Sequence, residues 1–263
     1  MTKKRIATLA TCLTLVGAVA VGGTLALLTS GPKGITNTFA TSTGYDETDG
    51  EMDFIIEEKP VQQNTVTGSW EFKTEGETDY TSDAQHYTNL VPDTTLAKNP
   101  RFQLRDGATD GTNPPDSWVV AKIDVEDAKK LNGLKITFSG SVGADWRIVK
   151  ATATGFEFDD STTFNANFLN TTYQNPDEGT TYYFIYDKKL SVSGETTTTN
   201  LFNQLSVAKD FDVKAFNEAI PVDSDNLPLE ISGVAVQALA DDLDGEGVLS
   251  QVMADAVAAF NAQ

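Results

Sequence analysis

The sequence consists largely of short runs of apolar, aromatic and β-branched residues, and turn-forming dipeptides separate one run from the next. Residues 118–125 read Trp-Val-Val-Ala-Lys-Ile-Asp-Val, an alternation in which neighbouring side chains face opposite sides of a strand. Turns between such runs are marked by Asn132-Gly133 and Ser193-Gly194. Many short strands with this punctuation predict an all-β fold, a jelly roll or β-sandwich.

The predicted strands share a β-branched and aromatic composition. They span residues 52–58, 65–73, 101–105, 117–125, 134–139, 146–154, 180–186, 200–207 and 229–239. In the last of them, residues 231–238 are small or apolar at nearly every position, which predicts a central strand buried on both faces. We expect the core to include Trp118, Val120, Ile123, Phe138, Trp146, Ile148, Phe184, Phe202, Ile231, Val234 and Val236.

A few short helices are predicted beside the strands. Residues 125–131 form a polar helix, and residues 213–219 follow Asp212, a suitable N-cap. Residues 247–262 place apolar side chains at helical spacing, which predicts a C-terminal helix packed against the sandwich. The polar segment 170–180 is interpreted as a loop.

The first 26 residues are predicted to be a secretory signal peptide rather than part of the fold. Lys3, Lys4 and Arg5 precede an uncharged apolar run over residues 6–28. Glycines and small residues weaken a helix near the end of this run, which favours cleavage. The run is also long enough to span a bilayer, so a retained membrane anchor is the alternative.

Charge and residue content exclude several classes of function. The chain has 38 acidic and 19 basic residues and a formal net charge of −19. This balance argues against nucleic acid as a partner, because the phosphate backbone requires a basic face, and against an anionic membrane surface. The single cysteine, Cys12, lies in the predicted signal, so the remaining chain has no disulfide, cysteine nucleophile or cysteine zinc site.

No catalytic constellation is recognisable in the sequence. The single histidine, His86, lies in a polar stretch without a nucleophile motif and is interpreted as a surface residue. The sequence contains neither the H-E-x-x-H motif of zinc proteases nor a glycine-rich phosphate loop. We therefore expect the protein not to be an enzyme and to require no cofactor.

Calcium is the one ligand that the residue pattern suggests. The side chains of Asp241, Asp242, Asp244 and Glu246 bring hard oxygen ligands together on a glycine-containing loop. The spacing does not match an EF-hand, and a solvated acidic loop is the alternative interpretation.

Four stretches have an order and spacing that are typical of one known family. They are Gly-Gly-Thr-Leu-Ala at 22–26 with Asn-Thr-Phe-Ala at 37–40, Leu-Val-Pro-Asp at 90–93 with Lys-Asn-Pro-Arg-Phe at 98–102, Asp-Ser-Trp-Val-Val-Ala-Lys-Ile at 116–123, and Leu-Phe-Asn-Gln-Leu-Ser-Val at 201–207 with Leu-Glu-Ile-Ser-Gly-Val-Ala-Val-Gln-Ala at 229–238. Together they resemble the TasA/camelysin family of secreted proteins from Gram-positive bacteria, which a SipW-type signal peptidase processes. The chain departs from the family at Leu25, where an aromatic residue is usual, at Asp93, where glycine is usual, and in an acidic insertion before Phe54.

The resemblance implies cleavage between Ala26 and Leu27 and assembly by donor-strand exchange. In TasA-like members the mature amino terminus of one subunit adds a strand to the next subunit. The donor would lie within residues 27–43, where Ile35, Asn37 and Phe39 share one face and Ile35 and Phe39 are the expected plugs. A disordered tail is the alternative, because glycines and a proline interrupt the segment.

The resemblance also implies a domain organisation and a function. The chain divides into a signal peptide (1–26), a donor-strand and linker segment (27–51) and a jelly-roll domain (52–263). The implied function is that of a secreted subunit of an extracellular fibre or biofilm matrix of a Gram-positive bacterium. Its partners would be further copies of itself and a matrix or anchoring protein, with no membrane contact after cleavage. The alternatives are a monomeric cell-surface adhesin or spore-coat component and, because camelysin relatives are classified so, a metallopeptidase.

Overall fold

The computed structural model describes residues 54–76, 78–83, 85–106, 113–174, 182–219, 229–245 and 247–261, together with the backbone of residues 33–34. The strands are β1 (Lys33–Gly34), β2 (Phe54–Glu57), β3 (Val61–Gln63), β4 (Trp70–Phe72), β5 (Thr94–Ala97), β6 (Arg101–Leu104), β7 (Ser117–Ile123), β8 (Ile136–Val142), β9 (Trp146–Thr152), β10 (Gly155–Phe158), β11 (Tyr182–Tyr186), β12 (Phe202–Val207) and β13 (Ile231–Gln237). The helices are α2 (Val125–Gly133), α3 (Ala166–Gln174), α4 (Val213–Ala219) and α5 (Val248–Asn261).

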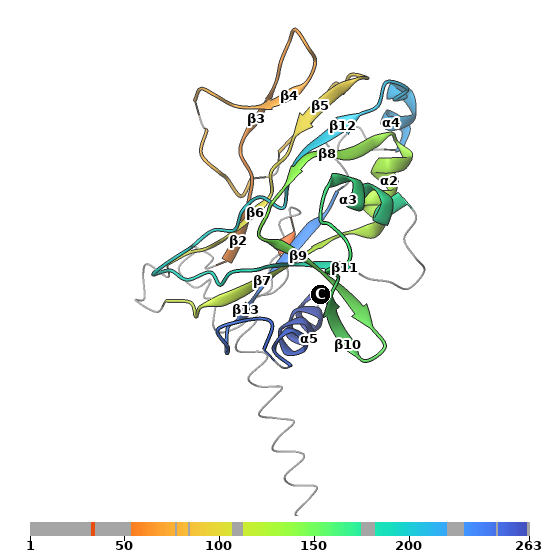
Figure 1. Cartoon of the computed structure of the whole chain (residues 1–263). Coiled ribbons are helices and arrows are strands. Elements are labelled where there is room, and N and C mark those ends of the chain that lie inside the picture. Colours follow the sequence, from red (N-terminus) through yellow and green to blue (C-terminus); the bar gives the residue numbers. More distant parts are fainter. Residues whose placement is uncertain are drawn as a thin grey trace, which may run out of the picture.

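The strands form a sandwich of sheets. One sheet has the order β1-β13-β7-β11-β9-β10, a second has the order β3-β4-β5-β12-β8, and β2 pairs with β6 in a small third sheet (Figure 1). All pairs are antiparallel except β4 with β5. The prediction of an all-β sandwich with a few short helices, one of them at the C-terminus, is confirmed.

The main core lies between the inner face of the first sheet and the other two sheets. Alternate residues of β7 and β13 point into it, among them Val119, Ala121 and Ala235, all fully buried. The opposite sheets contribute large side chains such as Leu96 and Phe202. Alternation along each strand is therefore what assigns these side chains to the core.

The outer face of the first sheet is also buried, because α5 packs across it (Figure 1). The helix contributes Leu249, Val252 and Met253 to a second apolar cluster, whose strand residues include Val120 and Val234. β13 is thus buried on both faces, as its sequence predicts, and every residue predicted to lie in the core is buried.

The two other predicted helices also form. Asp124 caps α2 by accepting a hydrogen bond from the backbone N–H of Asp127 (2.9 Å). Asp212 caps α4 by accepting from the N–H groups of Lys214 (2.9 Å) and Ala215 (3.1 Å), as predicted. Within the described part of the chain, no helix is both long and apolar enough to cross a membrane.

The prediction that residues 170–180 form a loop is wrong for residues 170–174, which belong to α3. The side chain of Asn165 accepts a hydrogen bond from the N–H of Phe168 (2.8 Å) at the start of this helix, and Leu169 is fully buried. Asn170 then donates to the carbonyl of Phe138 and accepts from its N–H, both at 2.7 Å. A polar helix is therefore held here by contacts with the edge of β8.

The predicted strand over residues 65–73 is too long at its start. The side chain of Asn64 accepts hydrogen bonds from Val66 N–H (2.9 Å) and Thr67 N–H (3.1 Å) and so closes a turn. Gly68 follows with a φ of 78°. Only β4 remains a strand here, and the predictions omit its hairpin partner β3 as well as the short strands β5 and β10.

Candidate functional site

The edge of β13 is where the predicted donor segment meets the folded domain. Lys33 pairs with Gly233 and Gly34 pairs with Ser232, antiparallel. Gly233 and Ser232 are two of the seven residues of β13. β2 lies beside both β1 and β13, so the contact is at the boundary between the first sheet and the small sheet.

Backbone direction along β13 fixes the kind of pairing at this edge. Asp124 N–H donates to the carbonyl of Glu230 (3.0 Å), next to the pair formed by β7 and β13. Hydrogen-bonding residues alternate along an antiparallel strand, so Ser232 directs its backbone groups towards β7 and Gly233 directs its own towards β1. Gly34 and Ser232 therefore form a non-hydrogen-bonded pair, the type in which the Cα atoms are only about 4.5 Å apart.

Gly233 is required at this edge because an aromatic ring lies against its backbone. A Cβ at Gly233 would overlap Phe102 and would lie 2.7 Å from its Cδ1. The ring is fully buried and cannot move easily, because it stacks on Phe54 and makes an edge contact with Trp146, each at a centroid distance of 5.8 Å. The sequence contains a signal for this close contact, since a glycine inside an apolar strand often marks the close approach of another group.

A buried ion pair fixes the end of β2 beside this edge. Lys98 Nζ lies 2.8 Å and 3.0 Å from the two carboxylate oxygens of Glu58, and the two side chains are 5% and 3% exposed. The adjacent Glu57 accepts from Nε of Arg101 at 2.7 Å. Arg101 in turn lies over the ring of Tyr80, 3.3 Å from its centroid. These ion pairs were not predicted from the sequence, because no local motif indicates them.

Tyr87 lies next to the same ion pair. Burial and, second, the charge of Glu58 raise the pKa of the Tyr87 hydroxyl well above its ordinary value. The hydroxyl donates to the carbonyl of Ala97 (2.6 Å). Tyr87 therefore acts as a neutral hydrogen-bond donor that ties the segment before β5 to that strand.

The predicted calcium ligands are directed to partners within the protein. Asp241 lies 2.8 Å from Lys189 Nζ, and this hydrogen bond lowers the pKa of Asp241. Asp242 accepts from the N–H of Asp244 (2.6 Å), and Asp244 lies 3.0 Å from Nη1 of Arg147. Glu246 lies outside the described residues.

Arg147 is the centre of this acidic region. Its guanidinium also lies 3.3 Å from Asp160 and 3.4 Å from Asp187, and it covers the ring of Phe158 at 3.3 Å. Burial lowers the pKa of Arg147, but hydrogen bonds and charges from Asp244, Asp160 and Asp187 outweigh it and raise the pKa. Among the residues that the structure describes, no three His, Cys, Asp or Glu side chains are placed to hold a metal ion. Calcium binding by the 241–246 loop stays a prediction.

The remaining predicted site residues divide into one that is described and several that are not. His86 is exposed in a loop, as predicted. Ala26, Leu27, Ile35, Asn37 and Phe39 lie outside the described residues, so cleavage and the identity of the donor plugs stay predictions.

Comparison of the chain with models of known protein families, with curated proteins and with solved structures finds no match. The fold and the site define a class of architecture: an all-β sandwich whose amino-terminal segment adds a short strand to the edge of β13.

Proposed function

We propose that this chain is a secreted, non-enzymatic structural protein, a subunit of an extracellular fibre or biofilm matrix that assembles by donor-strand exchange. One observation carries the proposal: Lys33 and Gly34, inside the predicted donor segment 27–43, pair with β13. A segment that pairs with this edge in its own chain can pair in the same register with the edge of another copy.

The register supports the predicted donor plugs. A donor strand that continued the pairing of Lys33 with Gly233 would place Ile35 opposite Ile231, on the face of β13 that carries the main core. Asn37 and Phe39 would follow on the same face. Isoleucine beside a fully buried isoleucine is the kind of cross-strand pair that stabilises a sheet.

The rigidity of β13 also favours strand addition. Both faces of the strand are packed, and its Gly233 is fixed against the ring of Phe102. An edge that is already ordered loses little conformational entropy when it accepts a strand. Because the donor and the acceptor are different surfaces, the contact is heterologous, and a heterologous contact that does not close makes filaments.

Charge supplies a control on assembly. With 38 acidic and 19 basic residues, copies of the chain repel one another at neutral pH. Specific strand pairing must overcome this repulsion, and salt or calcium would weaken it. We propose export to the surface or matrix of a Gram-positive bacterium, with an anchoring protein as a further partner.

Electron microscopy of the purified chain from residue 27 onwards tests the proposal. We expect filaments at raised protein concentration, more of them with added salt or calcium, and none from the same chain lacking residues 27–43. The deletion removes β1 and the predicted plugs but leaves β2 and everything after it. Its folding is checked by circular dichroism and thermal melting.

Two point variants refine the test without shortening the chain. Ile35→Asp should suppress filaments, because it places a charge where the donor would enter the core. Thr43→Asp adds the same charge at the end of the segment and should leave assembly intact. Monomers from the full chain under every salt and calcium condition would argue against self-assembly and favour a monomeric surface protein.

A further inference from the structure

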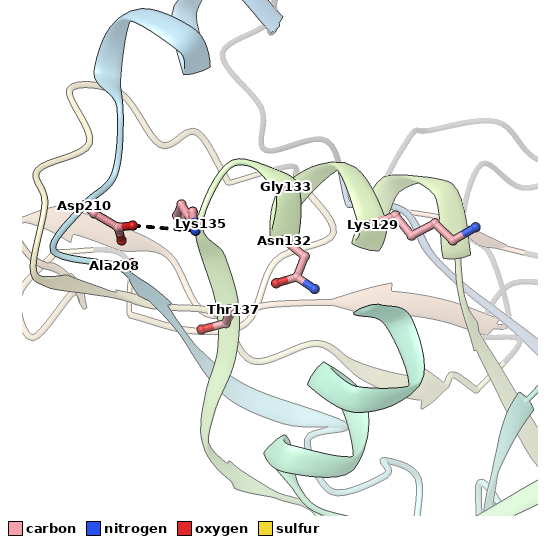
Figure 2. A pocket seen from close by; sticks show the side chains of 7 residues that line it. All are labelled: Lys129, Asn132, Gly133, Lys135, Thr137, Ala208 and Asp210. Atoms are coloured by element: carbon pink, nitrogen blue, oxygen red, sulfur yellow. Dashed lines mark ion pairs between the residues drawn. The ribbon is translucent and has the colours of Figure 1, made fainter. Parts of the chain in front are cut away.

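A polar hollow lies at the end of α2, where the helix leads into β8. It has a volume of about 590 Å³ and is lined by Lys129, Asn132, Gly133, Lys135, Thr137, Ala208 and Asp210. Figure 2 shows Asn132 and Thr137 near its middle, the pair of Lys135 and Asp210 at one end and Lys129 at the other. Two cations and one anion line a hollow on a chain in which acids outnumber bases two to one.

Both lysines have weak partners in this structure. Lys135 Nζ lies 3.5 Å from Asp210 Oδ2, and the two side chains are 55% and 73% exposed. Lys129 Nζ lies 2.9 Å from Glu126, whose side chain is 82% exposed. Exposed ion pairs of this kind contribute little to stability. An incoming carboxylate can therefore replace Asp210 or Glu126 without a large loss.

The backbone presents Lys135 at the rim of the hollow. Its φ is 65°, a left-handed conformation that lysine rarely adopts. Lys135 N–H donates to the carbonyl of Asn132 (2.9 Å), and its own carbonyl accepts from Ala208 N–H (2.9 Å). These two hydrogen bonds hold Lys135 in a backbone conformation that glycine or asparagine adopts more readily than lysine.

We propose that this hollow binds an acidic peptide segment, and that its partner is the acidic run over residues 46–53 of a second copy of the chain. That run reads Asp-Glu-Thr-Asp-Gly-Glu-Met-Asp, with five acids and no base. Carboxylates pair with the two lysines, and peptide carbonyls accept from the Asn132 amide and the Thr137 hydroxyl. The inference goes beyond strand exchange, because it concerns another surface and another segment.

The lining favours a peptide over an acidic sugar. Among the lining residues that the structure describes, none is aromatic, so they offer no apolar platform of the kind that usually receives a sugar ring. The described lining consists of two flexible point charges and small polar side chains, which suit separate carboxylates on an extended chain. A contact of this kind also reduces the repulsion between two acidic subunits.

Fluorescence anisotropy with a labelled peptide of residues 45–53 tests the proposal on the purified chain from residue 27 onwards. We expect saturable binding that weakens with added salt. The double variant Lys129→Gln, Lys135→Asn should weaken binding about tenfold, because two charged contacts are lost. Asparagine suits the left-handed conformation, so the fold is preserved. Asp210→Asn should tighten binding, because it removes the carboxylate that competes for Lys135.

Two controls show whether binding occurs in the hollow. Lys214→Gln removes an exposed lysine of α4 that does not line the hollow, and it should leave affinity unchanged. A peptide with every acid replaced by its amide should not bind. The proposal is overturned if the acidic peptide shows no saturable binding at low salt or if the double variant binds like the wild type. Binding of a uronic acid oligosaccharide in place of the peptide would overturn it too.

Because the assay uses a peptide and the isolated chain, its result does not depend on filament formation. Loss of peptide binding in the double variant, with filaments intact, would separate this surface from strand exchange.

Discussion

Replacing Lys98 with methionine is expected to lower the free energy of unfolding by about 3–5 kcal/mol, because it leaves a buried carboxylate without its cation. Glu58 is only 3% exposed, and both of its oxygens bond to Lys98. The loss should appear as a lower urea midpoint, followed by tryptophan fluorescence, in the chain from residue 27 onwards.

A second variant separates the loss of the cation from the loss of packing. Glu58→Leu combined with Lys98→Met removes both charges and should recover most of the lost stability. Lys214→Met breaks an exposed pair with Glu218 and should change stability by less than about 0.5 kcal/mol. If the free energy of unfolding of the Lys98→Met chain lay within about 1 kcal/mol of the wild-type value, the ion pair would not be needed to hold β2.

Replacing Gly233 with alanine is expected to cost about 3 kcal/mol, because the added methyl group overlaps the ring of Phe102. That ring is enclosed by Phe54 and Trp146, so either the small sheet or β13 must move. We expect a lower urea midpoint and fewer filaments, since β13 is the proposed acceptor.

A double-mutant cycle identifies the cause of the Gly233 effect. Phe102→Leu makes room for the new methyl group, so the double variant should lose less stability than the sum of the two single losses. Gly194→Ala is the matched control, because its Cβ would lie 3.8 Å from the nearest atom, Cβ of Ser191. Equal losses at Gly194 and Gly233 would point to a general effect of removing glycine instead.

The strands with the strongest periodicity could be predicted from the sequence. β7 and β13 are seven residues long: alternation in the sequence predicts β7, and the nearly continuous apolar composition of β13 predicts its burial on both faces. β5 and β10 are four residues long, too short for alternation to separate a strand from a loop. The polar helix α3 was not predicted, because the hydrogen bonds that hold it join Asn170 to Phe138 in β8, which is distant in sequence.

The candidate site could be predicted only in part. The resemblance placed a donor within residues 27–43, but nothing in the local sequence pairs it with Ser232 and Gly233. Glu58 and Lys98 are 40 residues apart, so no local motif pairs them. The sequence also does not distinguish a solvated glutamate from a buried one, and most glutamates are exposed. Gly233 carried a usable signal, yet its partner Phe102 lies in a distant strand.

Disulfide trapping between two different copies tests the central claim most directly. Once the segment with Cys12 is removed, the chain has no cysteine, so Gly34→Cys can be made in one chain and Ser232→Cys in another. The pair lies directly opposite in the register, at a separation that a disulfide can span. Ser193→Cys, at an exposed turn, replaces Ser232→Cys in the control mixture.

After oxidation of the mixed chains at assembling concentration, strand exchange predicts covalent heterodimers on a non-reducing gel and none in the control mixture. The account would be contradicted if no heterodimer formed while a single chain carrying both Gly34→Cys and Ser232→Cys closed its own internal disulfide. The amino-terminal strand would then belong to its own subunit and would not join one copy to the next.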